Sequence, residues 1–267
     1  MVKKGKEKKT DSIILGVIPA RFASSRLMGK PLADIGGKTL LQHTYEGAKN
    51  SKLMDKIIIA VDDEQVAKAA RSFGAAVMMT PKDCPSGSDR IAIVAKEFPR
   101  AEIIVNIQGD EPFISGTMID QAIEPLLFDL TVNVSTLAKK IETVEEFTSP
   151  SVTKVVFDYN NFALYFSRAP IPFVRDAENE EEMIEKASVY KHIGLYVYRK
   201  DSLFRFTQLN PTDLEQWEKL EQLRMLENGF KIKIVETEYD SFSVDTPEDL
   251  AKARKIYAKL KKIELGK

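Results

Sequence analysis

Short apolar runs rich in β-branched residues alternate with segments of helical periodicity along the first half of the chain. The run IILGVI at residues 13–18 has no polar side chain, which is typical of a parallel strand buried on both faces. Alternation of such strands with helices indicates βαβ units and a mainly parallel sheet. The expected strands are residues 13–18, 57–61, 75–79, 103–108 and 132–138, and the expected helices are residues 39–50, 64–73, 88–98 and 115–128.

The pattern changes after residue 148, where the runs VTKVVF and ALYFSR flank the turn sequence DYNN. This composition predicts a β-hairpin. The acidic, proline-punctuated residues 170–186 predict an exposed excursion. The remaining expected elements are strands 190–198 and 232–236 and helices 200–209, 212–228 and 247–262.

We therefore expect one α/β domain over residues 12–267, with a Rossmann-like, mainly parallel sheet flanked by helices. A small lobe at about residues 150–200 is expected to be inserted into it. Residues 1–11 are basic but lack the apolar segment of a secretion signal, so they are interpreted as a disordered leader.

Composition narrows the classes of partner. With 39 basic and 40 acidic residues the net charge is -1, which gives no overall field for nucleic acid or an anionic membrane. No stretch approaches the roughly 20 apolar residues of a membrane span. The single cysteine, Cys84, excludes an internal disulfide, suits a reducing cytoplasm and is interpreted as structural.

A basic loop follows the first expected strand, in the sequence PARFASSRLMGKPL at residues 19–32. Ligands of open α/β sheets bind at the carboxyl ends of strands, so Arg21, Arg26 and Lys30 could converge on one anion. The alternative is an ordinary solvated loop, because Arg and Lys are usually exposed.

A small-residue loop, PSGSDR, precedes the expected helix at residue 88. Ser86, Gly87 and Ser88 can present backbone N–H groups to a base or a phosphate. The alternative interpretation, with Ser88 acting as a helix N-cap, is compatible with ligand binding.

An acidic pair, Asp110 and Glu111, follows the strand that ends at Gln108. Magnesium takes one or two carboxylates and completes its shell with water and phosphate oxygens, so this position suits a magnesium site. An Asp-Glu-Pro turn before a helix is the alternative. In the later sequence VDTPEDL, helix capping accounts for the acids after Thr246 and leaves Asp245 as a second candidate metal ligand.

A cationic loop, a Gly/Ser loop and two separated aspartates fit the binding of a nucleoside triphosphate with magnesium. The chain has neither a GxGxxG after the first strand nor a GxxxxGK[ST], so neither a dinucleotide site nor a P-loop is supported. The triphosphate must therefore be held in another way.

These motifs together resemble the family of 3-deoxy-manno-octulosonate (Kdo) cytidylyltransferases, also called CMP-Kdo synthetases. The matching segments are IPARFASSRLMGKPL, PSGSDR, VNIQGDEPFI, ALYFSRAPIP, KHIGLY, LEQLR and VDTPEDL, in family order over residues 18–250. The family often has Pro where this chain has Met28, and Glu or Asp at position 89, where this chain has Asp. Neither position carries a charged ligand assigned below.

The resemblance implies a nucleotidyltransferase of the glycosyltransferase-A-like fold that uses Mg²⁺, acts in the cytoplasm and forms a homodimer. The anomeric 2-hydroxyl of Kdo would attack the α-phosphorus of CTP, releasing pyrophosphate and forming CMP-Kdo for lipopolysaccharide synthesis. The implied catalytic residues are Lys30, Arg26, Asp110 and Asp245, with Asp110 and Asp245 holding the metal; the nucleotide would contact Arg21, Arg26, Lys30, Ser86, Gly87, Ser88, Arg90 and Gln108.

For the sugar acid, the resemblance implies Gln108, Arg168, His192, Glu221 and Gln222. On local sequence alone, Arg168 could instead pair with the acidic excursion, His192 could pack among tyrosines, and Glu221 could be an exposed helix acid. His43, Trp217 and Leu220 are interpreted as structural, the last two as a core-facing stripe at i and i+3.

Other functions remain open from sequence. The chain could activate a related acidic sugar, such as sialic acid or 8-amino-Kdo. A glycosyltransferase acting on a nucleotide-sugar would not need the second carboxylate at Asp245, and a nucleotide-binding regulator would bind CTP without consuming it. The strands ALYFSR and YVY are expected to be more exposed than a monomer allows, which would agree with a dimer.

Overall fold

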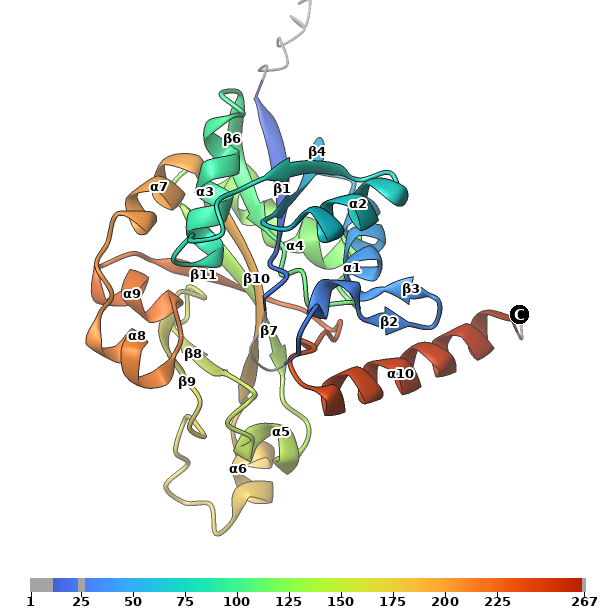
Figure 1. Ribbon diagram of the computed structural model, residues 1–267. Coiled ribbons are helices and arrows are strands. Elements are labelled where there is room, and N and C mark those ends of the chain that lie inside the picture. Colours follow the sequence, from blue (N-terminus) through green and yellow to red (C-terminus); the bar gives the residue numbers. More distant parts are fainter. Residues whose placement is uncertain (1–11, 24–26, 266–267) are drawn as a thin grey trace, which may run out of the picture.

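A computed structural model describes residues 12–23 and 27–265. The expected leader at residues 1–11 and the predicted ligand Arg26 lie outside these ranges. Figure 1 shows a twisted central sheet with helices on both faces, and a small lobe that extends from one end of the sheet.

The main sheet follows the order β11-β7-β10-β6-β1-β4-β5. Strand β1 (Ile13–Ala20) lies parallel to β4 (Lys56–Val61) and to β6 (Ala101–Asn106), and β4 lies parallel to β5 (Ala76–Met79). Leu15, Val17 and Ile18 are fully buried, because helices cover both faces of β1. The structure thus confirms the first strand, which was predicted from the apolar run.

One long strand runs against the others. Strand β10 (Tyr190–Arg199) lies antiparallel between β6 and β7 (Val134–Lys140), while β11 (Ile232–Glu236) is parallel to β7. The sheet is therefore mostly parallel but mixed, and β10 brings chain from the lobe to the carboxyl ends of the parallel strands.

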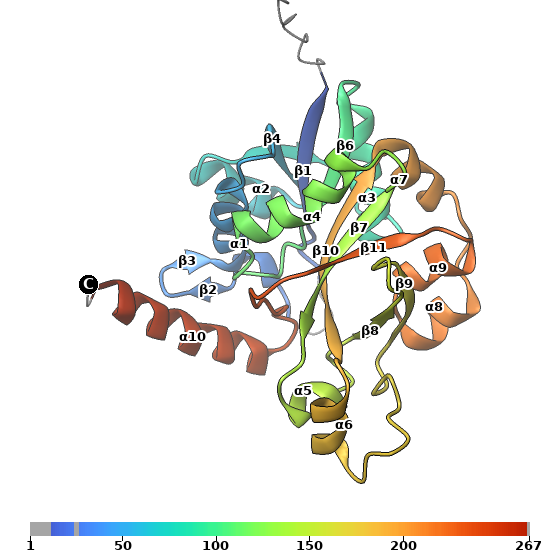
Figure 2. The same cartoon turned by 180° about the vertical axis from the view of Figure 1, so that it is seen from behind.

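Two apolar clusters cover the two faces. Helices α1 (Leu40–Lys49), α2 (Glu64–Ser72) and α4 (Gly116–Phe128) bury their apolar faces in one cluster. Helices α3 (Gly87–Lys96), α7 (Lys200–Thr207) and α9 (Gln222–Glu227) contribute to the other. Figure 2, the view from behind, shows α1 and α4 in front of the sheet, where Figure 1 shows α3 and α7.

The lobe follows β7 and returns through β10. It contains the predicted hairpin of β8 (Lys154–Phe157) and β9 (Ala163–Ser167), with helix α5 (Val144–Thr148) before it. The acidic excursion contains a short helix, α6 (Glu180–Lys186), because Asn179 caps its N-terminus and the acids occupy its first turn. The sequence analysis did not identify this helix, and none of the residues of α6 is buried, as expected for an exposed excursion.

The expected helix at residues 212–228 is two helices, α8 (Asp213–Glu218) and α9, separated by Lys219 with φ 54°. Trp217 is 75% exposed while Leu220 is buried, so the expectation of a shared core-facing stripe was wrong for Trp217. The last helix, α10 (Pro247–Leu265), begins where predicted. Sequence reasoning missed the small pair β2 (Asp34–Ile35) and β3 (Lys38–Thr39) and the 3₁₀ turn η1 (Lys30–Leu32).

The two tyrosines of the run YVY are buried within the sheet, so the expectation that this strand is unusually exposed was wrong. Leu164 of β9, in contrast, is exposed, as expected for ALYFSR. Among the described helices, none combines the length and the apolar character that crossing a membrane requires.

Candidate active site

Lys30 lies between two carboxylates at the carboxyl edge of the sheet. Its Nζ is 2.5 Å from Oδ2 of Asp110 and 3.0 Å from Oδ1 of Asp245. Burial lowers the pKa of Lys30, but the charges and hydrogen bonds of Asp110 and then Asp245 outweigh that effect and raise the pKa above its ordinary value. The predicted lysine and both predicted metal ligands are therefore brought together, with Lys30 charged.

Backbone geometry explains how the two aspartates meet. The acidic loop passes so close to the end of β1 that a Cβ on Gly109 would lie 2.6 Å from the carbonyl oxygen of Pro19. The backbone N–H of Val244 donates to the Asp110 carbonyl at 2.9 Å, which aligns the segment before α10 with the acidic loop. Asp249 accepts hydrogen bonds from the N–H groups of Asp245 and Thr246, and so fixes the start of α10.

Glu111, next to Asp110, is buried, and its carboxylate accepts a 2.7 Å hydrogen bond from the Ser241 hydroxyl. The backbone N–H of Gly194 also donates to it. Burial raises the pKa of Glu111 to about 7, and the nearby Asp110 charge acts in the same direction. The second acid of the pair is thus bonded to the segment before α10, whereas Asp110 pairs with Lys30.

The basic loop and the Gly/Ser loop contact each other. Arg21 donates to the carbonyl of Cys84 at 2.8 Å, and Cys84 itself is buried, as predicted for a structural residue. Ser86 caps α3 by accepting from the Asp89 N–H, so the interpretation of Ser88 as the cap was wrong, and the cap lies two residues earlier.

Ser88 is buried and donates instead to the Glu221 carboxylate at 3.1 Å. Burial raises the pKa of Glu221, against hydrogen bonds from Ser86 and Ser88 that lower it. The structure therefore places Glu221, with the buried Gln222 beside it, against the Gly/Ser loop.

Arg90 is fully buried. Its guanidinium pairs with Asp62 at 3.0 Å and donates to the Thr80 hydroxyl, while the other Asp62 oxygen accepts from the Phe22 N–H at 3.0 Å. Arg90 therefore cross-links the ends of β4, β5 and the basic loop from beneath the surface.

A cavity of about 750 Å³ extends from the carboxylate pair toward the lobe. Asp110, Asp245, Gln108, Arg168 and His192 all line it, so five predicted site residues share one space. Glu221 and Gln222 do not belong to its lining. Helix α5 and the segment before α10 complete its walls.

Arg168 does not pair with the acidic excursion. Its guanidinium donates to the carbonyl oxygens of Glu218 at 2.7 Å and Pro150 at 2.9 Å, and its N–H donates to the Glu218 carboxylate. These bonds fix its side chain in the cavity wall.

His192 packs edge-on against Phe166, with ring centroids 5.0 Å apart, and its Nε2 lies 2.9 Å from the Thr136 hydroxyl. Burial lowers the pKa of His192 to about 3, so the imidazole is neutral near neutral pH. His192 packs among aromatic rings, as the alternative to a sugar-binding role predicted. It also lines the cavity, so both descriptions apply to it. The other histidine, His43, has a structural contact, as predicted, because its Nε2 lies 2.7 Å from the Ile35 carbonyl oxygen.

Sequence reasoning missed Lys191, the neighbour of His192. Lys191 is buried and pairs with Glu146 of α5 and, at 2.8 Å, with Asp240. It thus ties the lobe to the segment that carries Asp245. In the sequence, Lys191 stood within the expected strand 190–198, and nothing in that run indicated which acids it would meet.

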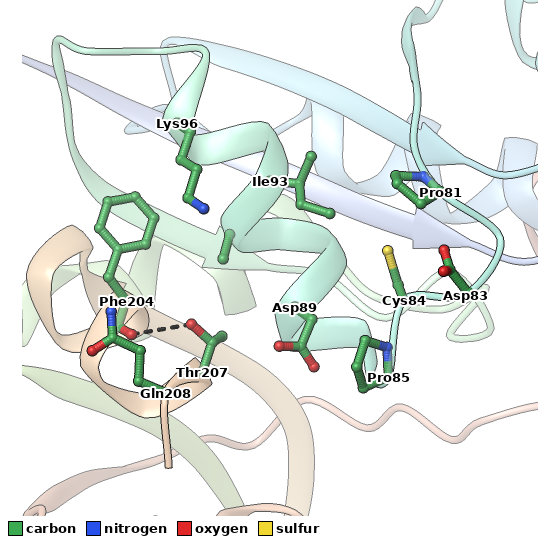
Figure 3. A pocket seen from close by; sticks show the side chains of 11 residues that line it. Pro81, Asp83, Cys84, Pro85, Asp89, Ile93, Lys96, Phe204, Thr207 and Gln208 are labelled. Carbon is green, nitrogen blue, oxygen red and sulfur yellow. Dashed lines mark hydrogen bonds between the residues drawn. The ribbon is translucent and has the colours of Figure 1, made fainter. Parts of the chain in front are cut away.

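A second cavity, of about 550 Å³, lies on the outer side of α3, between residues 81–85 and α7 (Figure 3). Phe204, Ile93 and Pro85 supply apolar walls, with Asp89 and Lys96 beside them. None of the described residues predicted for the site lines it. The second cavity is therefore not part of the predicted site.

Comparison with known proteins agrees with this geometry. The family described as cytidylyltransferase matches residues 15–234. A putative glucose-1-phosphate thymidylyltransferase from Bacillus anthracis, 17% identical, shares the fold with a TM-score of 0.64 over 91% of this chain and 95% of its own. The fold and the match define a nucleotidyltransferase of the cytidylyltransferase class.

Closer relatives narrow the class. The 3-deoxy-manno-octulosonate cytidylyltransferase of Geobacter sulfurreducens is 51% identical over 93% of this chain and 99% of its own length. That of Pelobacter propionicus is 52% identical over 91% and 97%, respectively. A solved CMP:2-keto-3-deoxy-manno-octonic acid synthetase complexed with CTP is 40% identical, with a TM-score of 0.86 over 93% of this chain and 99% of that chain. The chain belongs to the 3-deoxy-manno-octulosonate cytidylyltransferase family.

Proposed function

We propose that this protein transfers CMP from CTP to the anomeric 2-hydroxyl of Kdo, a step of lipopolysaccharide biosynthesis. The sugar oxygen forms a bond to the α-phosphorus, the bond from that phosphorus to the bridging oxygen breaks, and pyrophosphate leaves. Substitution at phosphorus depends on positioning and charge neutralisation, so a site without a charged histidine suits it.

The observation that carries this proposal is the position of Lys30 between Asp110 and Asp245, both of which line the polar cavity. A cation and two carboxylates are held there by three segments distant in sequence. The relatives' activity on Kdo and the CTP bound by the solved relative support the two substrates.

The carboxylate pair also fits Mg²⁺. The Lys30 ammonium already occupies the space between the two aspartates, as a cation attracted by both would. Within the described residues no three His, Cys, Asp or Glu side chains gather as a metal site, which agrees with an ion held by two carboxylates plus substrate oxygens. Asp110 and Asp245 would hold the ion, which would neutralise phosphate charge and polarise a phosphoryl oxygen.

Around CTP, Arg21, Arg26 and Lys30 neutralise the triphosphate, with Lys30 directed at the α-phosphoryl group. The Gly/Ser loop of Ser86, Gly87 and Ser88 lies around the cytosine. Arg90 supports that loop from the protein interior and does not contact the nucleotide, because its guanidinium is bonded to Asp62 and Thr80. The link between Arg21 and the Cys84 carbonyl supports this arrangement, since it joins the phosphate loop to the base loop.

In the cavity, Arg168 and His192 bind the sugar carboxylate and Gln108 lies between sugar and nucleotide. Arg168 contributes the charge, and His192 contributes a hydrogen bond from a neutral ring. Glu221 and Gln222 contact sugar hydroxyls only if the sugar reaches the Gly/Ser loop, because neither lines the cavity and Glu221 is bonded to Ser88.

The measurement that tests the function is pyrophosphate release from CTP and Mg²⁺ in the presence of Kdo, 8-amino-Kdo or sialic acid, with a no-sugar control. Release that depends on Kdo is expected. Release with another sugar but not with Kdo would assign a related acidic sugar. CTP binding without release in any arm would instead support a regulator.

A homodimer through the β8–β9 hairpin is part of the proposal. Of the described strands, β9 pairs only with β8, and Leu164 of β9 and Phe173 beyond it are exposed by 63% and 76%. Leu164→Glu is expected to shift the mass measured by light scattering from dimer to monomer. Leu130→Glu, at an exposed loop residue elsewhere, is the matched control and should leave the dimer intact.

The cellular location we propose is the cytoplasm. The lone cysteine gives the described fold no disulfide to maintain, and Cys84 is buried as a free thiol. Fractionation of cells producing the tagged chain should recover it with cytoplasmic markers, and recovery with periplasmic markers would contradict the assignment.

A further inference from the structure

Glu111 joins three parts of the site that are far apart in sequence. It follows Asp110 in the acidic loop, it is 7% exposed, and it lines the cavity. Its carboxylate accepts from Ser241, 130 positions away, and from the N–H of Gly194 in β10. A buried carboxylate is costly unless donors satisfy it, so these two donors are needed for Glu111 to remain where it is.

The Ser241 bond acts on the segment that carries Asp245. We call residues 237–246 the strap, since they link β11 to α10 across the acidic loop. Two hydrogen bonds join the strap to that loop, from Val244 to the Asp110 carbonyl at 2.9 Å and from Ser241 to Glu111 at 2.7 Å. Between them, the Phe242 ring packs against Phe113 of the loop, with centroids 5.5 Å apart. Of these contacts, the Ser241 bond is the one that holds the strap to a buried charge.

Gly194 provides the third point. The pairing of β10 with β7 shifts between Ile193 and Tyr196, and this bulge turns the Gly194 N–H toward Glu111. A Cβ at position 194 would lie 3.3 Å from Oε1 of Glu111, which is tighter than ordinary contact. Only a residue without a side chain leaves full room for the buried carboxylate.

We infer that Glu111 is a positioning residue that sets the separation of the Asp110 and Asp245 carboxylates through Ser241. The side-chain partner of Glu111 is Ser241, while Lys30 pairs with Asp110 and Asp245, so Glu111 acts through the strap. The inference rests on the proposed metal site at Asp110 and Asp245. Partners that orient metal ligands commonly contribute 10-fold to 100-fold in metal affinity, which sets the expected scale, roughly 10-fold, for losing one such bond.

The test measures binding of Mn²⁺ by electron paramagnetic resonance, with CTP present and no sugar, so that no turnover occurs. Ser241→Ala and Glu111→Ala are each expected to weaken Mn²⁺ binding by roughly 10-fold. The double variant is expected to bind as weakly as Glu111→Ala alone, because both changes remove one interaction.

Thr237→Val is the matched control. Thr237 is a buried hydroxyl residue in the same strap, but it donates at 2.8 Å to Gln121 of α4 rather than to Glu111. This variant should lower the thermal midpoint about as much as Ser241→Ala while leaving Mn²⁺ binding unchanged. If Thr237→Val and Ser241→Ala weaken Mn²⁺ binding equally, Glu111 has only a structural role and the inference is overturned.

Two further variants separate this inference from the metal site on which it rests. Asp110→Asn and Asp245→Asn should nearly abolish Mn²⁺ binding. If they leave it intact, the metal site itself is wrong. If they abolish it while Glu111→Ala and Ser241→Ala bind Mn²⁺ normally, the metal site stands and the positioning role of Glu111 is refuted.

Discussion

The Nζ atom of Lys30 lies 2.5 Å from Oδ2 of Asp110, although 80 positions separate the two residues in sequence. The same ammonium lies 3.0 Å from Asp245, so one cation is shared by two carboxylates. A divalent metal ion held by these aspartates, as proposed, would compete with Lys30 for them. Binding of Mg²⁺ with CTP would then release Lys30 toward the phosphate oxygens, which links the two charges that the reaction needs.

Replacing Lys30 with Met should have opposite effects on metal binding and on catalysis. Without nucleotide, Mn²⁺ should bind roughly 10-fold more tightly, about 1.4 kcal/mol, because its competitor is gone. Turnover should fall by roughly 100-fold or more, because a preorganised positive charge is lost. Lys38→Met, in a half-exposed ion pair with Glu46, is the control for removing a lysine and should change neither quantity. Weaker Mn²⁺ binding by Lys30→Met would disprove the competition.

Asp245→Asn should lower turnover by roughly two orders of magnitude while the fold is retained, because the amide keeps the shape but removes the charge that faces the metal and Lys30. Steady-state rates with saturating CTP, Kdo and Mg²⁺ provide the measurement. Glu238→Gln removes an exposed acid from the strap and should behave as the unsubstituted protein. A normal rate for a folded Asp245→Asn protein would exclude its assigned role.

Asp62→Ala should destabilise the protein by about 3 kcal/mol, because it leaves the fully buried Arg90 guanidinium without its ionic partner. It also removes the acceptor for the Phe22 N–H in the basic loop. Urea unfolding gives the comparison. The control is Glu64→Ala, two residues after Asp62, which breaks the exposed ion pair between Glu64 and Arg71. It should lower the free energy of unfolding by less than about 1 kcal/mol. Equal losses of unfolding free energy in the two variants would show that the buried Arg90–Asp62 pair stabilises the protein no more than an exposed pair does.

His192 should make the protein sensitive to acid. Its pKa in the folded state is lowered to about 3, from the 6.5 of an ordinary histidine, so the unfolded chain binds the proton more readily between these values. Stability from this group is therefore complete above the unfolded pKa and falls as the pH decreases. The loss between about pH 7 and about pH 5 is about 2 kcal/mol.

Urea unfolding at the two pH values tests this dependence. His192→Gln should remove that part of the pH dependence, so the variant should lose less stability on acidification than the unsubstituted protein. His43→Gln removes the other histidine of the chain and should leave the acid sensitivity in place. An unchanged slope in His192→Gln would mean that the ring is protonated in the folded protein at mildly acidic pH.

Much of the fold was predictable because the residues that a strand or a helix buries recur at a regular spacing in the sequence. The all-apolar run of β1 can only be a strand covered on both faces, and the loops after such strands must meet at one edge of the sheet. That rule alone brings Lys30 to Asp110. Asp245 was identified by elimination, since capping explained the acids that follow it and the contacts of Asp249 confirm that explanation.

The failures arise where tertiary contacts decide what local sequence leaves open. Trp217 and Leu220 would share a face only on an unbroken helix, and Lys219 breaks the helix between them with φ 54°. Arg90 belongs to a motif that is proposed to lie around the cytosine, yet its guanidinium pairs with Asp62, a buried acid from another loop. Likewise, nothing in the sequence showed that Glu111 faces Ser241, because 130 positions separate them.

The lobe joins the sheet through two strands that are hydrogen-bonded to each other, with Tyr190 opposite Lys140 at the junction. Such a paired ribbon resists sliding, since a shift by one residue would place every side chain on the wrong face. It yields to torsion much more easily, because a β-ribbon is already twisted. Lys191 and His192 lie on this ribbon and line the cavity, so the far wall of the cavity and the central sheet share one continuous hydrogen-bonded ladder.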